Sequence, residues 1–286
     1  MENAIEIRGL SKHYKDFSLN AIDLEVPKGC IVGFIGDNGA GKTTTLRLIL
    51  NLAHPDDGEI RVFNLHHIKD QKAIKQQLGV VFDECNFHET LKAPDVGTIL
   101  RQFYVNWDND LFQSYLTRLG LPSNKTIKEY SRGMKMKLSI AAALAHHPKL
   151  LLLDEATGGL DPIVRNEILD IFREFIQDEE RAILISSHIT SDLEKVCDYI
   201  YFIHQGEILL HGPKDNLLDT YGILRCKNEE LAAMRDLNPL RVRKNSFGCE
   251  MLITDRQIAQ KRHPEVIVDR LTLEDIMLFF IKGEVA

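Results

Sequence analysis

The octapeptide GDNGAGKT, residues 36–43, constrains the fold more than any other stretch of the chain, because it fits the pattern G-x-x-x-x-G-K-[ST]. The apolar run CIVGFIG precedes it, and KTTTLRLILNLA follows with apolar residues at helical spacing. Glycines let such a loop curl so that successive backbone N–H groups face one anion, and the following helix adds the positive end of its dipole. The segment therefore predicts a strand, a phosphate-binding loop and a helix.

Lys42 and Thr43 carry the chemistry expected of this loop. The Lys42 ammonium would neutralise the β- and γ-phosphates of a nucleotide, and the Thr43 hydroxyl would bind Mg²⁺. A chance match in a glycine-rich turn is the alternative, and the strand–loop–helix context argues against it. The residues expected to surround the phosphates are Gly36, Asp37, Asn38, Gly39, Ala40, Gly41, Lys42, Thr43 and Thr44.

Polar residues also follow two other apolar strands. In LLLLDEATGGLD, Asp154 ends a strand and Glu155 follows it. We expect Asp154 to hold Mg²⁺ through water, and Glu155 to orient or deprotonate the water that attacks the γ-phosphate. In AILISSH, His188 follows a strand end that should lie near the same phosphates, where it could hold the water and Glu155 in place. Either pattern alone is weak, since acidic residues often cap helices and isolated histidines are usually surface residues.

The rest of the chain predicts an α/β fold. Short apolar runs alternate with helical stretches, which favours a parallel sheet with crossover helices. The strand candidates after the loop are residues 79–82, 150–154, 182–187 and 199–203. The first thirty residues alternate apolar and polar side chains, as half-buried antiparallel strands do.

We expect two domains, residues 1–220 and 221–286. Within the first, residues from about 88 to 147 predict a helical insert without a strand. The pattern breaks at Gly212-Pro213, and the last part has its own short strands and an apolar helix near 271–281. We interpret it as a small α+β appendage, in which that helix is more typical of a core than of an interface.

Composition excludes several classes of protein. The net charge of −7 gives no global basic field for nucleic acid or acidic lipid. Five scattered cysteines, none spaced CxxC, favour free thiols in a reducing cytosol over a zinc site or a disulfide framework. The N-terminal residues lack the pattern of a signal peptide, and the apolar runs are far shorter than the ~20 residues that span a bilayer. Any membrane part is therefore expected in another chain.

The order of the motifs resembles the nucleotide-binding subunit of ATP-binding cassette (ABC) transporters. A tyrosine, the phosphate loop, a helical insert, YSRGMK, the Asp-Glu strand, GGLD and SSH follow one another within about residues 2–215. The combination of YSRGM with LLLLDEATGGLD is the specific part of the likeness. The resemblance implies a P-loop NTPase fold of ABC type, with a mixed sheet core, an antiparallel β subdomain and a helical insert. It also implies an ATPase that drives a separate transmembrane permease subunit.

The resemblance assigns a role to a second helix start, in YSRGMK. In the family, two nucleotide-binding subunits pack head to tail, and this helix points its N-terminal end at the γ-phosphate bound by the other subunit. Ser131 and the Gly133 amide would therefore bind the partner's ATP, as a hydroxyl and free N–H groups at a helix start can. Asp161 would lie at the same interface and Tyr14 would stack on adenine. The two subunits would form a homodimer or a heterodimer.

The sequence departs from the family pattern at four positions. Arg132 and Met134 replace a glycine and the glutamine of the usual SGGQ, and Ala156 stands where proline is usual. Asp83 aligns with a glutamine that touches Mg²⁺ and senses the transmembrane partner. An aspartate could still bind Mg²⁺, directly or through water. A solvated turn carboxylate is the alternative interpretation of Asp83.

Three functions are compatible with these motifs: a transporter ATPase, a soluble relative acting on DNA or ribosomes, and a regulatory nucleotide binder. DNA-repair relatives carry long coiled coils between loop and signature, and the segment between Lys42 and Ser131 has no room for one. Ribosome-acting relatives fuse two cassettes, and this chain has one phosphate loop. Glu155 and His188 argue against a binder that does not hydrolyse. We expect no nucleic-acid partner, and a cytoplasmic subunit on the inner face of the cell membrane through its permease.

Two stretches bear on cargo and coupling. The segment from the signature to LLLLDEATGGLDP, together with FDECNFHETL, resembles bacterial exporters of antimicrobial peptides, toxins or drugs. We expect residues 83–90, with the helical insert behind them, to form the groove that receives a short cytoplasmic helix of the permease. The cargo touches the membrane subunit, so the motifs do not identify it.

Overall fold

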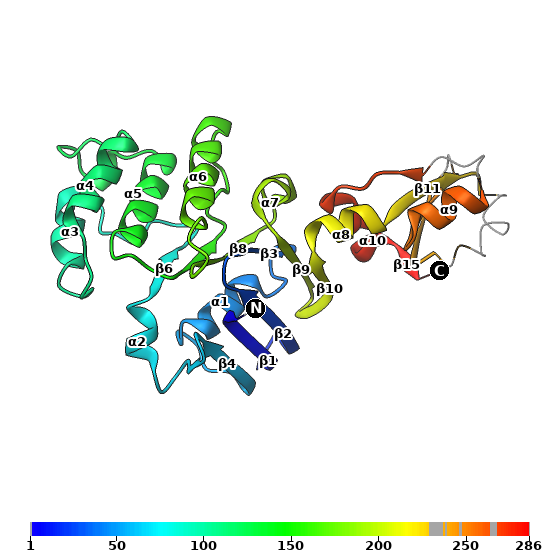
Figure 1. Cartoon of the computed structure of the whole chain (residues 1–286), viewed down its shortest axis with the longest axis horizontal. Helices are drawn as coiled ribbons and strands as arrows, with labels where there is room; N and C mark the ends of the chain where they lie inside the picture. The colour runs from blue at the N-terminus through cyan, green and yellow to red at the C-terminus, as the bar shows by residue number, and fades with distance from the viewer. Residues whose placement is uncertain (1, 229–236, 238, 246–247, 264–267, 286) are drawn as a thin grey trace.

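The computed structural model describes residues 2–228, 237, 239–245, 248–263 and 268–285. The described strands form three sheets. The helices of residues 93–144 lie at one end of the molecule, two sheets lie in the middle, and the third sheet lies at the opposite end (Figure 1).

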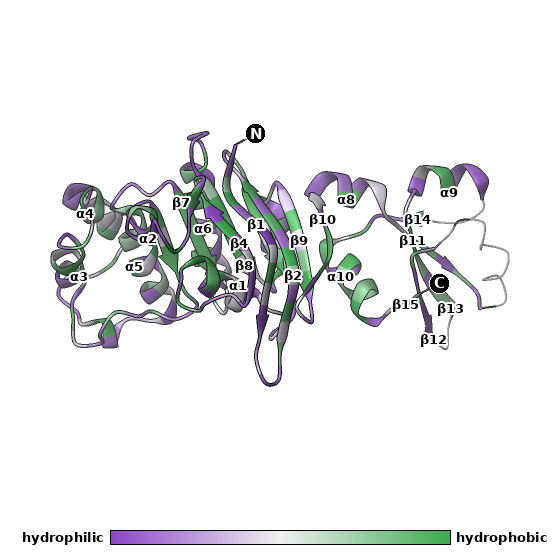
Figure 2. Cartoon of the chain, turned by 90° about the horizontal axis from the view of Figure 1, so that it is seen from below, coloured by the Kyte–Doolittle hydropathy of each residue, from purple (hydrophilic) through white to green (hydrophobic). Residues whose placement is uncertain are grey.

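The central sheet has six strands in the order β10-β9-β3-β8-β7-β6. Their bounds are β3 Ile31–Ile35, β6 Leu78–Val81, β7 Leu150–Asp154, β8 Ala182–Ser187, β9 Tyr199–His204 and β10 Glu207–Pro213. Five of them run parallel, and β10 is antiparallel to β9. Strands β3, β7 and β8 are buried along their whole length, as strands covered on both faces are. The hydrophobic residues of β7 and β8 stand out in Figure 2.

A four-stranded antiparallel sheet, in the order β2-β1-β4-β5, covers one face of the central sheet. Its strands are β1 Asn3–His13, β2 Ser18–Pro27, β4 Asp57–Val62 and β5 Leu65–His66. Val32 and Phe34 of β3 pack on this side, with Ile5 and Ile7 of β1. Alternation along β3 turns Ile31 and Ile35 to the other face, into the helical core.

The helices of the N-terminal part fall largely where the helical patterns predict them. They are α1 Lys42–Ile49, α2 Gln71–Lys75, α3 Ala93–Leu100, α4 Asn109–Arg118, α5 Arg132–Leu144, α6 Pro162–Phe175 and α7 Thr190–Val196, with a 3₁₀ turn at Ile127–Glu129. The predicted insert contains α3, α4, the turn and α5; its only β feature among the described residues is a bridge between Lys92 and Thr126. Helix α5 also packs on the sheet, since a Cβ at Gly79 of β6 would lie 2.7 Å from the Ala143 carbonyl oxygen.

The C-terminal part has its own sheet, in the order β14-β11-β13-β12-β15. Its elements are α8 Lys214–Thr220, β11 Gly222–Cys226, β12 Arg241–Asn245, β13 Gly248–Ile253, α9 Arg256–Arg262, β14 Val268–Asp269, α10 Leu273–Lys282 and β15 Glu284–Val285. The proposed boundary at 220/221 lies between α8 and β11 and remains a prediction.

Helix α10 joins the C-terminal sheet to the rest of the chain. Ile276 and Phe279 are buried in the same core as Leu193 of α7, and Glu194 of α7 accepts a 2.6 Å hydrogen bond from the Leu273 N–H. Among the described helices, none has the length and apolarity to cross a bilayer. The predicted α/β architecture, with an antiparallel subdomain, a helical insert and an α+β C-terminal part, is confirmed.

Candidate nucleotide-binding and catalytic site

The phosphate loop lies between β3 and α1, as its sequence predicts. Gly36 leaves β3 against β9, where a Cβ would lie 2.3 Å from the Ile203 carbonyl oxygen, so only glycine fits. Gly41 caps α1 with φ of 119°, a conformation that favours glycine. The loop can therefore curl tightly enough to present its backbone N–H groups to an anion.

Lys42 is the buried cation of this loop, with 5% of its surface exposed. Its ammonium donates to the carbonyl oxygens of Gly36 at 2.6 Å and Asp37 at 3.1 Å. It also lies 3.3 Å from Glu155 Oε1, an ion pair without hydrogen-bond geometry. The remaining predicted phosphate contacts lie on the same loop and first helical turn. They range from buried Ala40 to exposed Asn38 and Thr43.

The Asp154 carboxylate is 3% exposed and accepts two hydroxyl hydrogen bonds. Thr43 Oγ1 donates to Oδ2 at 2.9 Å, and Ser186 Oγ donates to Oδ1 at 2.5 Å. This group of hard oxygen atoms at the mouth of the loop fits Mg²⁺, which takes few protein ligands when it binds with a nucleotide. The sequence alone identifies Ser186 only as part of a strand end. The parallel pairing of Asp154 with Ser186 reveals its role.

Glu155 is held between the loop and His188. Its Oε2 atom lies 2.7 Å from His188 Nδ1, and its backbone N–H donates to the Ser186 carbonyl oxygen at 3.0 Å. Its φ of 50° is unusual for a non-glycine residue and turns the chain sharply after β7. The carboxylate is therefore aimed at the space beside Lys42 and Asp154, where an acid–base group could act on a water molecule.

Ser131, Gly133 and Asp161 lie elsewhere in the chain. Ser131 caps α5 and accepts from the Met134 N–H at 3.2 Å, and its side chain is exposed. Asp161 caps α6, where it accepts from the N–H groups of the second and third helical residues. In the described part of the chain, no hydrogen bond or ion pair joins Ser131 or Asp161 to the phosphate loop. The N-terminus of α5, which Ser131 caps, therefore makes no such contact with the phosphate loop at the N-terminus of α1 within one chain.

Arg132 connects the signature helix to the GGLD turn. A Cβ at Gly159 would lie 2.8 Å from Arg132 Nη1 and 2.9 Å from its Cζ, so the guanidinium rests directly on this glycine. Gly159 has φ of 67°, in the left-handed region. In the sequence, Arg132 is only a replacement for a family glycine. Its contact with Gly159 joins residues that are distant in the chain.

Tyr14 and Asp83 are both exposed. Tyr14 lies in the turn between β1 and β2, 47% exposed, and its N–H donates to the Phe17 carbonyl oxygen. Phe17 lies near the loop, since a Cβ at Gly41 would be 3.0 Å from its ring. Asp83 follows β6, which pairs with β7, so it lies at the sheet edge that carries Asp154. The structure thus leaves both side chains accessible to a ligand.

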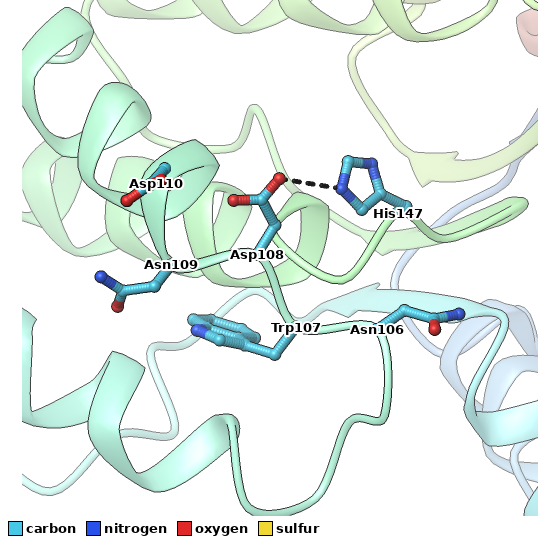
Figure 3. Close-up of a pocket in the computed structure, with 6 residues that line it drawn as sticks. All are labelled: Asn106, Trp107, Asp108, Asn109, Asp110 and His147. Carbon is cyan, nitrogen blue, oxygen red and sulfur yellow. Dashed lines mark hydrogen bonds and ion pairs between the residues drawn. The ribbon is translucent and has the colours of Figure 1, made fainter.

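An open pocket of about 590 Å³ lies apart from this site, beside the start of α4. Asp108 and His147 in its wall are joined at 3.2 Å (Figure 3). Asp108 also caps α4 by accepting from the Leu111 N–H, and this bond, with the His147 contact, lowers the pKa of its carboxyl. The Asp108 carboxylate therefore has a structural role as a helix cap.

Comparisons with known proteins identify the family of this chain. The family model described as "ABC transporter" matches residues 19–158. The bacitracin transport ATP-binding protein BcrA of Bacillus licheniformis is 36% identical, over 76% of this chain and 72% of that protein. The lantibiotic transport ATP-binding protein SrtF of Streptococcus pyogenes is 34% identical, over 74% and 91%. A solved ATP-binding subunit of an ABC transporter superposes with a TM-score of 0.68 at 25% identity, covering 75% of this chain and 91% of that one.

The fold, the phosphate loop and these relatives all support ATP hydrolysis as the activity of the chain. A buried lysine on a phosphate loop with a carboxylate beside it suits ATP hydrolysis. The chain belongs to the ABC transporter family, as an ATP-hydrolysing ATP-binding subunit with a P-loop α/β fold.

Proposed function

We propose that the chain powers an export system as a head-to-tail dimer attached to a separate transmembrane permease. The observation that carries this proposal is the separation of two groups within one chain. Glu155 contacts both Lys42 and His188, whereas Ser131 caps a different helix and its side chain is exposed. A head-to-tail dimer would bring Ser131 of one subunit to the nucleotide held by the other.

The nucleotide would be held mainly by the backbone of residues 36–44. Lys42 would neutralise the β- and γ-phosphates, and the exposed Tyr14 ring would stack on adenine. Mg²⁺ would supply charge neutralisation, held by Thr43 and, through water, by Asp154. Asp83, just after the neighbouring strand β6, is the proposed further oxygen ligand, directly or through water.

Glu155 is the proposed base for the attacking water. Its carboxylate has one oxygen toward Lys42 and the other on His188, so its direction is set from both sides. His188 would keep Glu155 and the water in line and bond the γ-phosphate. Ser131 and the Gly133 amide of the second subunit would stabilise the charge on that phosphate, because a capping hydroxyl and helix N–H groups favour an anion. Asp161 would join the two sites at the interface.

A complementation experiment tests the composite site. Lys42→Ala destroys the phosphate loop and keeps the signature helix, whereas Ser131→Arg blocks the signature and keeps the loop. Each variant alone should be nearly inactive. A mixed dimer would contain one intact site, with the loop of the Ser131→Arg chain and the signature of the Lys42→Ala chain. Mixing the two should therefore restore ATP hydrolysis to as much as half of the wild-type rate per dimer.

Two controls make this result decisive. Mixing Lys42→Ala with Glu155→Gln should restore no ATP hydrolysis. Both residues belong to the part of the site that contains the phosphate loop, so each of the two sites in a mixed dimer carries one of the substitutions. Ser114→Arg, an exposed serine on α4, should hydrolyse ATP as the wild type does. Full activity of a monomeric Ser131→Arg protein would contradict the composite site.

The permease contact is proposed at a groove of about 170 Å³ beside β6. It is formed by the segment after β6 and by α3 and α5, and is lined by Val80, Val81, Phe82, Glu84, Asn86, Phe87, Leu100, Tyr104, Ser139, Ala142 and Ala143. Phe103 and Val105 nearby in the chain are 68% and 88% exposed, so apolar surface is available to a partner helix. This surface would hold the subunit at the inner face of the cell membrane.

Co-purification from native membranes tests this contact, because the permease should accompany the tagged chain. Glu84→Lys in the groove should weaken co-purification, and Glu174→Lys, which lies on α6 outside the groove, should not. If Glu84→Lys and Phe87→Asp both recover as much permease as the wild type, the contact lies elsewhere.

An antimicrobial peptide is the proposed cargo, because the relatives named above are bacitracin and lantibiotic transport proteins. Cells expressing the chain with its permease should tolerate more of such a peptide than cells expressing Glu155→Gln. Equal sensitivity across a panel of bacitracin and lantibiotics would argue for another cargo.

A further inference from the structure

Cys226 and Cys249 lie directly opposite each other on the antiparallel strands β11 and β13. Their Sγ atoms are 3.1 Å apart. Cys249 is 2% exposed, and Cys226 is half-buried at the end of β11. The chain thus brings two thiols, far apart in sequence, into contact at one end of the C-terminal sheet.

Alternation along the strands places this pair on the inner face of the sheet. The opposed pair two residues further along, Leu224 and Met251, is completely buried. The pair between them, Arg225 and Glu250, forms an ion pair on the other face. The register is therefore set by a buried apolar face and by a charged outer face, and the two sulfur atoms meet without any change of register.

The geometry suits a covalent link. Directly opposed residues of antiparallel strands have Cα atoms ~4.5–5.5 Å apart, and disulfides span Cα distances of ~4.4–6.8 Å. We propose that Cys226 and Cys249 form a peroxide-sensitive dithiol that closes reversibly to an intramolecular disulfide. The bond would tie β11 to β13 and close the segment between them, which includes β12.

The other cysteines differ in their surroundings. Burial raises the pKa of the Cys197 thiol strongly and that of the Cys30 thiol as well, which lowers the fraction of reactive thiolate at neutral pH. Cys85 is half-buried in the segment after β6. The contact between two sulfur atoms is therefore specific, among the described cysteines, to Cys226 and Cys249.

The reaction needs one peroxide per bond. The more exposed Cys226 thiol releases its proton, and the thiolate attacks one oxygen of hydrogen peroxide. The O–O bond breaks, a sulfenic acid is formed, and the departing hydroxide takes up the released proton to give water. The Cys249 sulfur then attacks the Cys226 sulfur, the S–O bond breaks, and a second water leaves with the Cys249 proton. Two thiols lose two electrons and two protons in total, and the peroxide is reduced to two waters. A small dithiol reductant reverses the change.

Peptide mapping of the full-length protein tests this assignment. The reduced protein is treated with a small excess of hydrogen peroxide, denatured, and alkylated with N-ethylmaleimide. Of its five cysteines, two should escape alkylation, and digestion should release peptides joined through Cys226 and Cys249. Dithiothreitol should separate these peptides and restore both alkylation sites. The wild-type measurement is informative whether or not any variant folds.

Three variants sharpen the test. Cys226→Ser and Cys249→Ser should each abolish the joined peptide, and Cys30→Ser should leave it unchanged. The proposal is overturned if all five cysteines stay alkylatable after peroxide, or if the joined peptides contain another cysteine. It is equally overturned if Cys226 is oxidised to sulfinic acid while Cys249 remains open to alkylation.

Discussion

Glu155 Oε2 lies 2.7 Å from His188 Nδ1, although the two residues directly follow different strands of the central sheet, β7 and β8. The opposite oxygen of the same carboxylate lies 3.3 Å from Lys42. This carboxylate, held from both sides beside the phosphate loop, is the group that we propose as the base for a water at the γ-phosphate. The first two predictions follow from this contact.

Glu155→Gln should bind ATP and fail to hydrolyse it. The amide keeps the shape of the side chain and cannot take a proton, so kcat should fall by about 10²–10⁴-fold. Bound nucleotide would persist, and an ATP-bound dimer should accumulate, visible by size-exclusion chromatography with ATP. Glu174→Gln, on the outer surface of α6, serves as the matched control. Normal turnover by Glu155→Gln would refute its assignment as the base.

His188→Ala should reduce kcat about 10²-fold and change ATP affinity little, because the lost contact orients Glu155 and stabilises charge that develops in the reaction. The measurement is steady-state ATPase activity beside equilibrium binding of a nucleotide analogue. His147→Ala, another exposed histidine bonded to a carboxylate, should match the wild type. A larger effect on binding than on kcat would assign His188 to nucleotide affinity instead.

Gly159→Ala should destabilise the protein more than Gly120→Ala. Both glycines have similar positive φ, 67° and 65°, so each substitution carries a backbone strain of roughly 1–2 kcal/mol. Only the Cβ at Gly159 meets a neighbour, Arg132, whereas nothing lies within 4 Å at Gly120. The difference in free energy of unfolding should shrink in an Arg132→Gly background. Urea denaturation of the four variants measures it, and equal losses would dismiss the Arg132 contact.

Arg165→Met should lower the free energy of unfolding by about 3–5 kcal/mol, because it leaves a buried charge uncompensated. Asp192 on α7 is 0% exposed, and its carboxylate lies 3.6 Å from Arg165 Nε on α6. Adding Asp192→Leu to Arg165→Met should recover most of the loss, since an apolar pair of similar size replaces a buried ion pair without large cost. Chemical denaturation checks both, and a double variant as unstable as Arg165→Met would contradict this account.

His146 should make stability depend on pH. Its ring is 1% exposed, stacks on Tyr104, and its Nε2–H donates to the Leu78 carbonyl oxygen at 2.9 Å. Burial lowers its pKa to about 4. The unfolded chain, with a histidine pKa of ~6.5, therefore binds more protons between these values. The stability that neutral His146 contributes is complete above the unfolded pKa of ~6.5. It is lost as the pH falls toward the folded pKa of about 4.

The full effect of His146 is on the order of 3 kcal/mol. Urea denaturation near neutral pH and again near the folded pKa should show that His146→Gln loses less stability on acidification than the wild type. His54→Gln, an exposed histidine, should keep the wild-type difference. Identical losses in all three proteins would mean that His146 does not titrate in this range.

Several contacts of the site were beyond the reach of motif analysis. The hydroxyl of Ser186 reaches Asp154 because β7 and β8 pair in parallel with these two residues in register. Arg132 meets Gly159 because α5 ends a helical insert that folds back on the sheet. A single sequence shows which residues are polar and where a strand ends, and gives no register between strands that long helices separate.

The sequence by itself determined the phosphate loop, the buried strands and the helical insert, because each depends on the local spacing of glycines, apolar runs and helix starts. Only the tertiary structure decided which side chains meet. It joined Glu155 to His188, Asp192 to Arg165 and Cys226 to Cys249. Such contacts depend on strand register and helix packing, where burial of apolar faces selects one arrangement from many that the local pattern allows.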